Sequence, residues 1–185
     1  RMSSAASDVY KRQLLNQVTE KDGHPLPRIE DNLDALAGAK VFSTLDLTSG
    51  YYQVEVAEED RDKTAFVTGR GHHLRFLTMP FGLCNAPSTF QRLMERVLDG
   101  LQWRTVVIYL DDVIVFSKTV EDHLEHLSEV LERFNQHNLK LKPRKCELLK
   151  TQVEFLGHVV TPSGVKTIPA LVEKIKEWEI PRNQR

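Results

Sequence analysis

Two short apolar runs flank a pair of adjacent aspartates in the middle of the chain. Residues 106–109 (VVIY) and 113–116 (VIVF) are β-branched or aromatic, and Asp111 and Asp112 lie between them. Such composition favours two short strands, and the polar pair between them marks the turn of a hairpin. Both strands are expected to be buried on both faces, which would hold two carboxylates at the edge of an apolar sheet.

Other segments rich in strand-forming residues predict further extended structure. The segment 40–47 (KVFSTLDL) has strand composition and carries Asp46 near its exposed end, before a turn at 48–50. The acidic segment 57–62 is expected to be a solvated loop. We expect additional extended segments at 51–56, at 139–149, in a hairpin of 64–68 and 73–77 joined across 69–71, and in a hairpin over 153–160 bent at Gly157 and His158.

Apolar residues at helical spacing predict two helices before the aspartate pair. The first begins at 25–27, where proline suits the first turn, and ends at Gly38. The second begins with Asn85 as its cap and Pro87 in its first turn, and it runs to Leu98. We expect it to pack on the sheet that carries the aspartates through an apolar face of Phe90, Leu93, Met94, Val97 and Leu101.

Two further helices are predicted after the pair. Thr119 and Asp122 resemble a capping box and start a helix that ends near Asn138. Its apolar face is predicted to consist of Leu124, Leu127, Leu131 and Phe134. A short amphipathic helix over 171–178 is expected to start near Pro169. Because strands interleave with helices that cover the sheet, the fold class is α+β or mixed α/β.

The bulk composition is that of one domain, or one domain plus a fragment, with 185 residues and a net charge of −1. Without a global basic field, a nucleic-acid partner would be held by a local basic patch or through metal ions. Cys84 and Cys146 lack zinc-ligand spacing and are expected to be reduced thiols, although one disulfide is compatible with the sequence. No apolar run approaches the roughly 18 residues of a membrane span, and no signal peptide is evident.

Asp46 and the aspartate pair form a candidate metal site. If the strand 40–47 neighbours the hairpin in one sheet, the three carboxylates converge, and hard divalent cations such as Mg²⁺ bind such groups. Two ions held there would activate an attacking hydroxyl and stabilise the leaving oxygen in a phosphoryl transfer. The alternative is that Asp111 and Asp112 only form a turn and that Asp46 caps a separate turn before Gly50.

Seven sequence blocks between residues 26 and 160 decide between these interpretations, and the similarity they define covers about 14–180: LPRIEDNLDAL, FSTLDLTSGYYQV, DKTAFVT, LTMPFGLCNAPSTFQRLM, VIYLDDVIVFS, HLEHLSEVL and VEFLGHVV. In this order and spacing, the chain resembles the reverse transcriptases of long-terminal-repeat retrotransposons, the gypsy-like group most closely. The resemblance implies an α+β fold, namely a right-hand polymerase palm, an antiparallel sheet covered by helices, with partial fingers.

The resemblance also implies a division of the chain. Residues 14–161 would be the palm with partial fingers, and 162–185 would start the connection on the thumb side. Residues 1–13 (RMSSAASDVYKRQ) show no hydrophobic periodicity and are expected to be a non-native leader. The family's preceding finger strands are not recognisable, so polymerase competence of this exact chain is an open question.

Site residues follow from the resemblance position by position. Asp46, Asp111 and Asp112 would be the catalytic carboxylates that hold Mg²⁺, with Mn²⁺ as a possible substitute. Tyr51 would lie beneath the incoming sugar and exclude a 2′-hydroxyl, with an ordinary packed tyrosine as the alternative. The remaining implied positions are the triphosphate-binding amides of Leu47, Thr48, Ser49 and Gly50, the nucleotide pocket of Pro80, Phe81 and Gly82, and the primer grip of Leu156, Gly157 and His158.

The implied function is that of an RNA-directed and DNA-directed DNA polymerase that adds deoxynucleotides to a primer 3′-hydroxyl. Its partners would be an RNA or DNA template with primer, deoxynucleoside triphosphates, and the missing fingers, connection and RNase H segments of a parent polyprotein, with no membrane. It would act inside the cell, in cytoplasmic particles of the element. The alternatives are an inactive relic or domesticated module that binds nucleic acid or protein, and a different two-metal enzyme such as a nuclease.

Three weaker features carry two interpretations each. His123 and His126 lie three apart on a predicted helix, where a solvated face is favoured over a metal pair. The basic run of Lys140, Lys142, Arg144 and Lys145 would either follow phosphates or be a solvated charge run. Cys84 is expected to be a small packed residue beside the pocket.

Overall fold

The computed structural model describes residues 12–69 and 71–168, and its central element is a four-stranded antiparallel sheet. The strand order is β4-β5-β1-β6, and the bounds are Val106–Tyr109 for β4, Asp112–Ser117 for β5, Val41–Asp46 for β1 and Glu147–Lys150 for β6. All three pairings in this sheet are antiparallel. The predicted strand 40–47 and the predicted hairpin around the aspartate pair are therefore confirmed.

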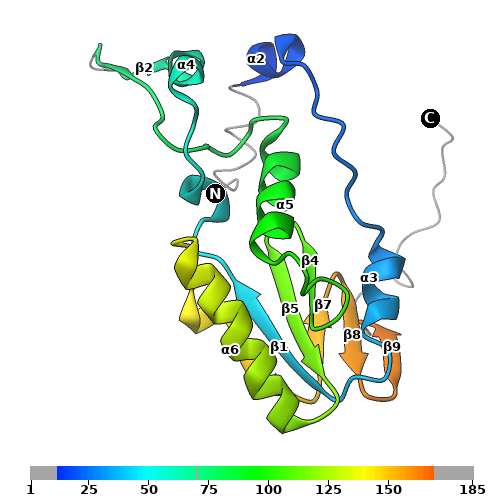
Figure 1. The fold of residues 1–185 in the computed structure, drawn as a ribbon. Coiled ribbons are helices and arrows are strands. Elements are labelled where there is room, and N and C mark those ends of the chain that lie inside the picture. The colour runs from blue at the N-terminus through cyan, green and yellow to red at the C-terminus, as the bar shows by residue number, and fades with distance from the viewer. Residues whose placement is uncertain (1–11, 70, 169–185) are drawn as a thin grey trace, which may run out of the picture.

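The sheet is covered on both faces, which explains why its strands are apolar throughout. Val113 and Val115 of β5 face one core, whereas Ile114 and Phe116 face the other. The first core is closed by α5 (Ala86–Val97) and α6 (Val120–Gln136). The second is closed by α3 (Ile29–Ala35) and by a three-stranded sheet of β7 (Val153–Phe155), β8 (His158–Thr161) and β9 (Gly164–Thr167), seen beside the main sheet in Figure 1.

Smaller elements lie beyond one end of the sheet, where the turn after β1 leads away from it (Figure 1). These elements are α2 (Gln13–Val18), the 3₁₀ turns η1 (Gly50–Gln53) and η2 (Asp62–Thr64), α4 (Glu58–Arg61), β2 (Phe66–Val67) and β3 (His73–Leu74). A further 3₁₀ turn, η3 (Pro143–Lys145), precedes β6. The predicted hairpin over 64–77 is confirmed, with shorter strands than expected.

Three short segments differ from the prediction. The first part of 51–56 is a 3₁₀ turn, and the acidic segment 57–62 contains α4, so the strand and the loop expected there are wrong. Such elements of three or four residues are too short to show a helical repeat in the sequence. In 139–149 only the end is a strand, because η3 interrupts the alternation. The helix expected over 171–178 lies outside the described residues.

The helix ends are partly as predicted. α3 begins at Ile29, so the start expected at 25–27, with proline in the first turn, is wrong. Thr119 caps α6, since its hydroxyl accepts a hydrogen bond of 3.1 Å from the Asp122 amide. Gly38 follows α3 with a φ of +78°, a conformation that glycine adopts without strain. Asn85 stands at the N-cap of α5 but does not cap it. Its side chain instead donates to the Glu20 carbonyl and accepts from the Asp22 amide, and so ties down the segment after α2.

The predicted apolar face of α6 is wrong by one position over part of its length. Leu124 and Leu131 are 52% and 40% exposed, whereas His123 and Val130 are fully buried. Leu127 and Phe134 are buried as expected. The buried residues at 123, 127, 130 and 134 thus define the inner face, and the solvated face that was favoured for His123 is also wrong.

Candidate active site

The aspartate pair lies at the tip of the β4–β5 hairpin. Tyr109 and Asp112 are opposite each other in the register, so Leu110 and Asp111 form a two-residue turn. Leu110 has a φ of +54°, a left-handed conformation that is uncommon for a leucine. Its amide donates a 2.7 Å hydrogen bond to Oε1 of Gln91 in α5, which holds the turn from the side.

Asp46 lies beside this turn because β1 pairs with β5. Asp46, the last residue of β1, is directly opposite Asp112, the first residue of β5. The predicted neighbourhood of the three carboxylates is therefore confirmed as geometry. Within residues 12–69 and 71–168, however, no three acidic, histidine or cysteine side chains are already closed around one point as metal ligands would be. Oδ2 of Asp46 is paired instead with Nζ of Lys145 at 3.1 Å.

Asp111 is the carboxylate of the site whose charged form is least favoured by its surroundings. Its Oδ1 is buried and has no hydrogen-bond partner. Burial, followed by the charges of Asp112 and Asp46, raises the pKa of Asp111 to about 6. The pKa of Asp112 is raised by burial and by Asp46, against an opposing effect of Lys145. A buried, unpaired carboxylate oxygen is costly unless a proton or a cation neutralises it, and the all-oxygen donor set suits a hard divalent ion.

The turn after β1 brings the backbone close to Asp111. A Cβ on Gly50 would lie 3.0 Å from Asp111 Oδ1 and 2.8 Å from Cζ of Phe90, so the approach requires glycine here. Ser49 has a φ of +51°. The Thr48 amide donates to the Lys140 carbonyl at 2.9 Å and is already engaged. The triphosphate contacts predicted for the amides of Leu47, Thr48, Ser49 and Gly50 stay a prediction. The Thr48 amide could make such a contact only by giving up its bond to Lys140.

Tyr51 and Phe81 form an aromatic cluster, and Tyr51 connects it to the surroundings of Asp111. Their ring centroids are 5.1 Å apart, and Tyr51 also packs edge-on against Phe90 at 5.5 Å. Burial and the charge of Asp111 raise the pKa of Tyr51 to about 12, so the phenol is neutral. Pro80 is buried beside Phe81, and Gly82 turns the chain with a φ of +92°. The structure thus brings together two of the segments that the sequence assigned to one nucleotide pocket.

The β7–β8 hairpin reaches the carboxylates through one of its three predicted residues. Leu156, at the turn, lines a cavity of about 150 Å³ together with Asp46 and Asp112. Gly157 shares the turn, and His158 starts β8 with its Nδ1 at 2.9 Å from the Leu156 carbonyl. Neither of these two lines that cavity.

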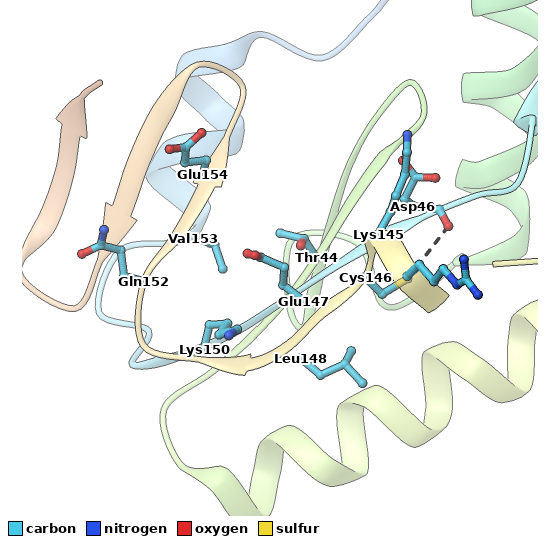
Figure 2. Close-up of a pocket in the computed structure, with 11 residues that line it drawn as sticks. Thr44, Asp46, Lys145, Cys146, Glu147, Leu148, Lys150, Gln152, Val153 and Glu154 are labelled. Atoms are coloured by element: carbon cyan, nitrogen blue, oxygen red, sulfur yellow. Dashed lines mark hydrogen bonds and ion pairs between the residues drawn. The ribbon is translucent and has the colours of Figure 1, made fainter. Parts of the chain in front are cut away.

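A larger polar cleft of about 940 Å³ adjoins this cavity, between the β1–β6 edge and β7, and shares Thr44, Asp46, Lys145 and Glu154 with it. Figure 2 shows Lys145 reaching Asp46 there, with Thr44, Glu147 and Glu154 on the walls. Of the basic run, Arg144 and Lys145 line this cleft. The main chain of Lys142 instead bonds β1, since its amide donates to the Asp46 carbonyl at 2.8 Å.

Gln91 is a site residue that the sequence prediction missed. It is fully buried in α5, and its Nε2 donates to Oε1 of Glu95 at 2.9 Å. The other oxygen of Glu95 is 3.0 Å from Nε2 of His24. One signal was available, because Gln91, Met94 and Leu98 share the spacing of a buried helical stripe, and a glutamine in such a stripe needs a polar partner.

The two histidines are engaged by serine hydroxyls of the central sheet. His123 is held between two serine hydroxyls, with Nε2 at 2.7 Å from Ser43 and Nδ1 at 2.9 Å from Ser117. His126 contacts the same Ser117 through Nδ1 at 2.8 Å. Both ring nitrogens of His123 are occupied, so these residues form a structural network. Cys84 and Cys146 are free, and the disulfide that the sequence left open is not formed.

Comparison with solved structures defines the class of protein first. The chain superimposes on a foamy viral protease-reverse transcriptase solved in complex with double-stranded DNA, with a TM-score of 0.84 and 25% identity over 92% of this chain and 30% of that one. A second structure of that enzyme, with an RNA/DNA hybrid, gives a TM-score of 0.81 at 24% identity, covering 92% of this chain and 23% of that one. The predicted α+β polymerase palm is therefore confirmed.

Sequence comparison then gives the family. The model of "Reverse transcriptase (RNA-dependent DNA polymerase)" matches residues 1–160, and the chain belongs to that family. It is 43% identical over 171 residues to the Pol polyprotein of transposon 297 and 41% identical over 167 residues to that of transposon gypsy, both from Drosophila melanogaster. These matches cover 92% and 90% of the chain but only 16% of each polyprotein. The resemblance to gypsy-like elements is confirmed.

In the described part of the chain, no helix has the length and apolar character needed to cross a bilayer.

Proposed function

We propose that this chain is the polymerase segment of a longer Pol polyprotein and extends a DNA primer along an RNA or DNA template. The observation that carries the proposal is the pairing of Asp46 with Asp112 beside the buried, unpaired Oδ1 of Asp111. Three carboxylates at one sheet edge are a poor arrangement for stability alone, because their mutual repulsion is relieved only by added positive charge.

Asp46, Asp111 and Asp112 are the residues that would hold Mg²⁺, or Mn²⁺ in its place. Ions bound there would lower the pKa of the primer hydroxyl and stabilise charge on the departing pyrophosphate. Lys145 is paired with Oδ2 of Asp46, and a cation bound to that oxygen would compete with the Lys145 ammonium for it. The cavity shared by Leu156, Asp46 and Asp112 is where the primer end would approach, with Gly157 and His158 supporting the hairpin.

Tyr51 and Phe81 would form the floor under the incoming deoxynucleotide, because their rings pack together and Tyr51 is close enough to Asp111 to feel its charge. A flat ring beneath C2′ leaves room for hydrogen and not for a hydroxyl. Pro80 and Gly82 shape the segment that carries Phe81, and the turn 47–50 would face the triphosphate. Turn amides near a glycine are suited to bind anions.

The partners follow from the same site and from the length of the relatives. The chain spans 16% of the transposon 297 polyprotein, so the remaining fingers, connection and RNase H segments would come from the rest of a parent chain. A template–primer duplex and deoxynucleoside triphosphates complete the reaction. We place it inside the cell, in particles of the element.

A chimaera provides the test. Residues 12–168 replace their counterpart in the transposon 297 polyprotein, whose 43% identity favours correct folding, and extension of a DNA primer on RNA is measured with Mg²⁺. The chimaera should extend the primer, Asp111→Asn should reduce the rate by about a thousandfold or more, and Asp99→Asn, at an exposed acid, should not. Full extension by a folded Asp111→Asn chimaera would contradict the assignment. Binding without extension by the unmutated chimaera would favour a relic or binding module, and shortening of the primer would favour a nuclease.

A further inference from the structure

The turn that carries Asp111 is connected to a distant part of the chain by three side chains that are hydrogen-bonded one to the next. The Leu110 amide donates to Gln91, Gln91 donates to Glu95, and Glu95 accepts from Nε2 of His24. The segment around His24 is itself fixed on α5 by the Arg92–Asp22 ion pair. The connection therefore joins the segment after α2 to the hairpin tip through two residues of α5.

Chemistry fixes the direction of every bond in this connection. The Leu110 amide can only donate, so Gln91 must present its oxygen to the turn and its nitrogen to Glu95. Glu95 then receives donors on both oxygens, which a carboxylate can accept and a carboxamide cannot. His24 must carry its proton on Nε2 in order to donate to Glu95. One amide rotamer and one imidazole tautomer satisfy all three contacts.

The turn needs such support because its conformation is unfavourable by itself. Leu110 is held at a φ of +54°, and the neighbouring Asp111 buries an unpaired carboxylate oxygen. If the Leu110 amide lost its acceptor, the turn would gain by rotating that peptide toward another partner, and Asp111 would move with it.

From this geometry we propose that Gln91 is a positioning residue for Asp111, and that Glu95 and His24 hold the Gln91 amide in the orientation that this role requires. The inference rests on the proposed function for its effect on catalysis. Its structural content, the orientation of Asp111 for metal binding, can be measured without turnover.

Substitutions that keep the side-chain shape but change the hydrogen-bond donors and acceptors test the positioning role of Gln91. Gln91→Leu removes the acceptor, and Glu95→Gln places an amide where two donors already point. The double substitution Q91E/E95Q restores a consistent pattern. Its new carboxylate at position 91 would accept from the Leu110 amide and from the new carboxamide at position 95, whose oxygen would accept from His24. Gln136→Leu and Glu129→Gln, both on the exposed side of α6, are matched controls.

Two measurements are the primary readouts. The first is the affinity of the chain for Mn²⁺ in the absence of substrate, and the second is the rate of hydrogen exchange at the Leu110 amide. We expect Gln91→Leu and Glu95→Gln to weaken Mn²⁺ binding about tenfold and to speed Leu110 exchange at least tenfold, with partial recovery in the double variant and no change in the controls. In the transposon 297 chimaera, the same two variants should lower kcat about tenfold or more with KM for the nucleotide within a factor of about three.

The outcomes separate the inference from the proposed function. If Asp111→Asn stops extension while folded Gln91→Leu leaves Mn²⁺ affinity, Leu110 exchange and kcat unchanged, the positioning role is wrong and the polymerase assignment stands. If the unmutated chimaera does not extend a primer, the polymerase assignment fails, and the Mn²⁺ and exchange measurements still decide the role of Gln91. An equal loss in Glu95→Gln and in the double variant would overturn the role given to Glu95.

Discussion

The space between Gly50 and Asp111 is too small for a side chain: a Cβ on Gly50 would lie 3.0 Å from Oδ1 of the aspartate. This oxygen is the one that lacks a hydrogen-bond partner. The turn after β1 therefore closes over the carboxylate and excludes protein donors from it, which leaves a ligand or a proton as the means of neutralising it.

Gly50→Ala should displace Asp111 or the Phe90 ring, since the added methyl would also lie 2.8 Å from Phe90 Cζ. Overpacking of this kind costs about 1–3 kcal/mol in the free energy of unfolding, measured by urea titration. Gly23→Ala is the matched control, because nothing lies within 4 Å of the position of its Cβ. Equal stability of the two variants would show that the site is looser than this contact implies.

The pH dependence of stability should report Asp111 directly. Its pKa is raised to about 6 in the folded chain, so the folded state binds more protons than the unfolded state between pH 4 and pH 6. Stability is therefore highest below pH 4, as far as this group is concerned, and is lost as the pH rises through 6. A rise of about two pKa units corresponds to roughly 3 kcal/mol at most, and partial exposure reduces it to about 1–2 kcal/mol.

Asp111→Asn should remove that loss. In chelator, the variant should be about 1–2 kcal/mol more stable than the parent chain at pH 8 and nearly equal to it at pH 4, by urea titration at both values. Asp99→Asn, at an exposed position, should follow the parent at both. A parent chain more stable than Asp111→Asn at pH 8 would mean that the carboxylate has a partner.

Leu127 and Leu124 test the orientation of α6. Leu127 is 7% exposed in the core between helix and sheet, and Leu124 is 52% exposed. Leu127→Ala should cost about 2–4 kcal/mol through lost burial and the cavity left behind, whereas Leu124→Ala should cost well under about 1 kcal/mol. Similar losses for the two variants in urea titrations would place the inner face where the sequence pattern put it.

The sequence could not decide that orientation. Stripes through 123, 127, 130 and 134 and through 124, 127, 131 and 134 share two members, and hydrophobicity favours the second. The choice is made by Ser43 and Ser117, which place hydroxyls on the sheet face that α6 covers and so require a polar residue opposite them. Such a requirement comes from strands that are remote along the chain.

The strands around the carboxylates were predictable because their signal is local in the sequence. Composition alone separates them from helices, and the adjacency of Asp46 to Asp112 needs only that β1 lies next to β5. What the pattern could not contain is the close approach of Gly50 to Asp111, or the bond from Gln91 to Leu110. Both depend on the tertiary packing of α5 against the hairpin tip.

His123 should behave as a buried neutral imidazole. Burial, together with the neighbouring His126, lowers its pKa, so the folded state binds fewer protons than the unfolded state. Stability is therefore present above the ordinary histidine pKa of about 6.5 and is lost as the pH falls below it. His123→Ala should cost about 2–4 kcal/mol at pH 8, because Ser43 and Ser117 lose a shared partner and a cavity forms. His137→Ala, at an exposed position, should cost little, and an equal loss in both would contradict the network.

Tyr51 should set the choice between deoxyribonucleotides and ribonucleotides in the chimaera. Its ring is held against Phe81 at 5.1 Å and Phe90 at 5.5 Å, so it cannot move aside to admit a 2′-hydroxyl. Tyr51→Val should raise kcat/KM for ribonucleotides relative to deoxyribonucleotides by about a hundredfold, the scale on which removing a steric block of a few kcal/mol acts. Tyr51→Phe, which keeps the ring and loses the neutral hydroxyl, should retain the original preference. If Tyr51→Phe relaxed the choice as much as Tyr51→Val, the hydroxyl rather than the ring would be the selective group, and the floor assigned to Tyr51 would be wrong.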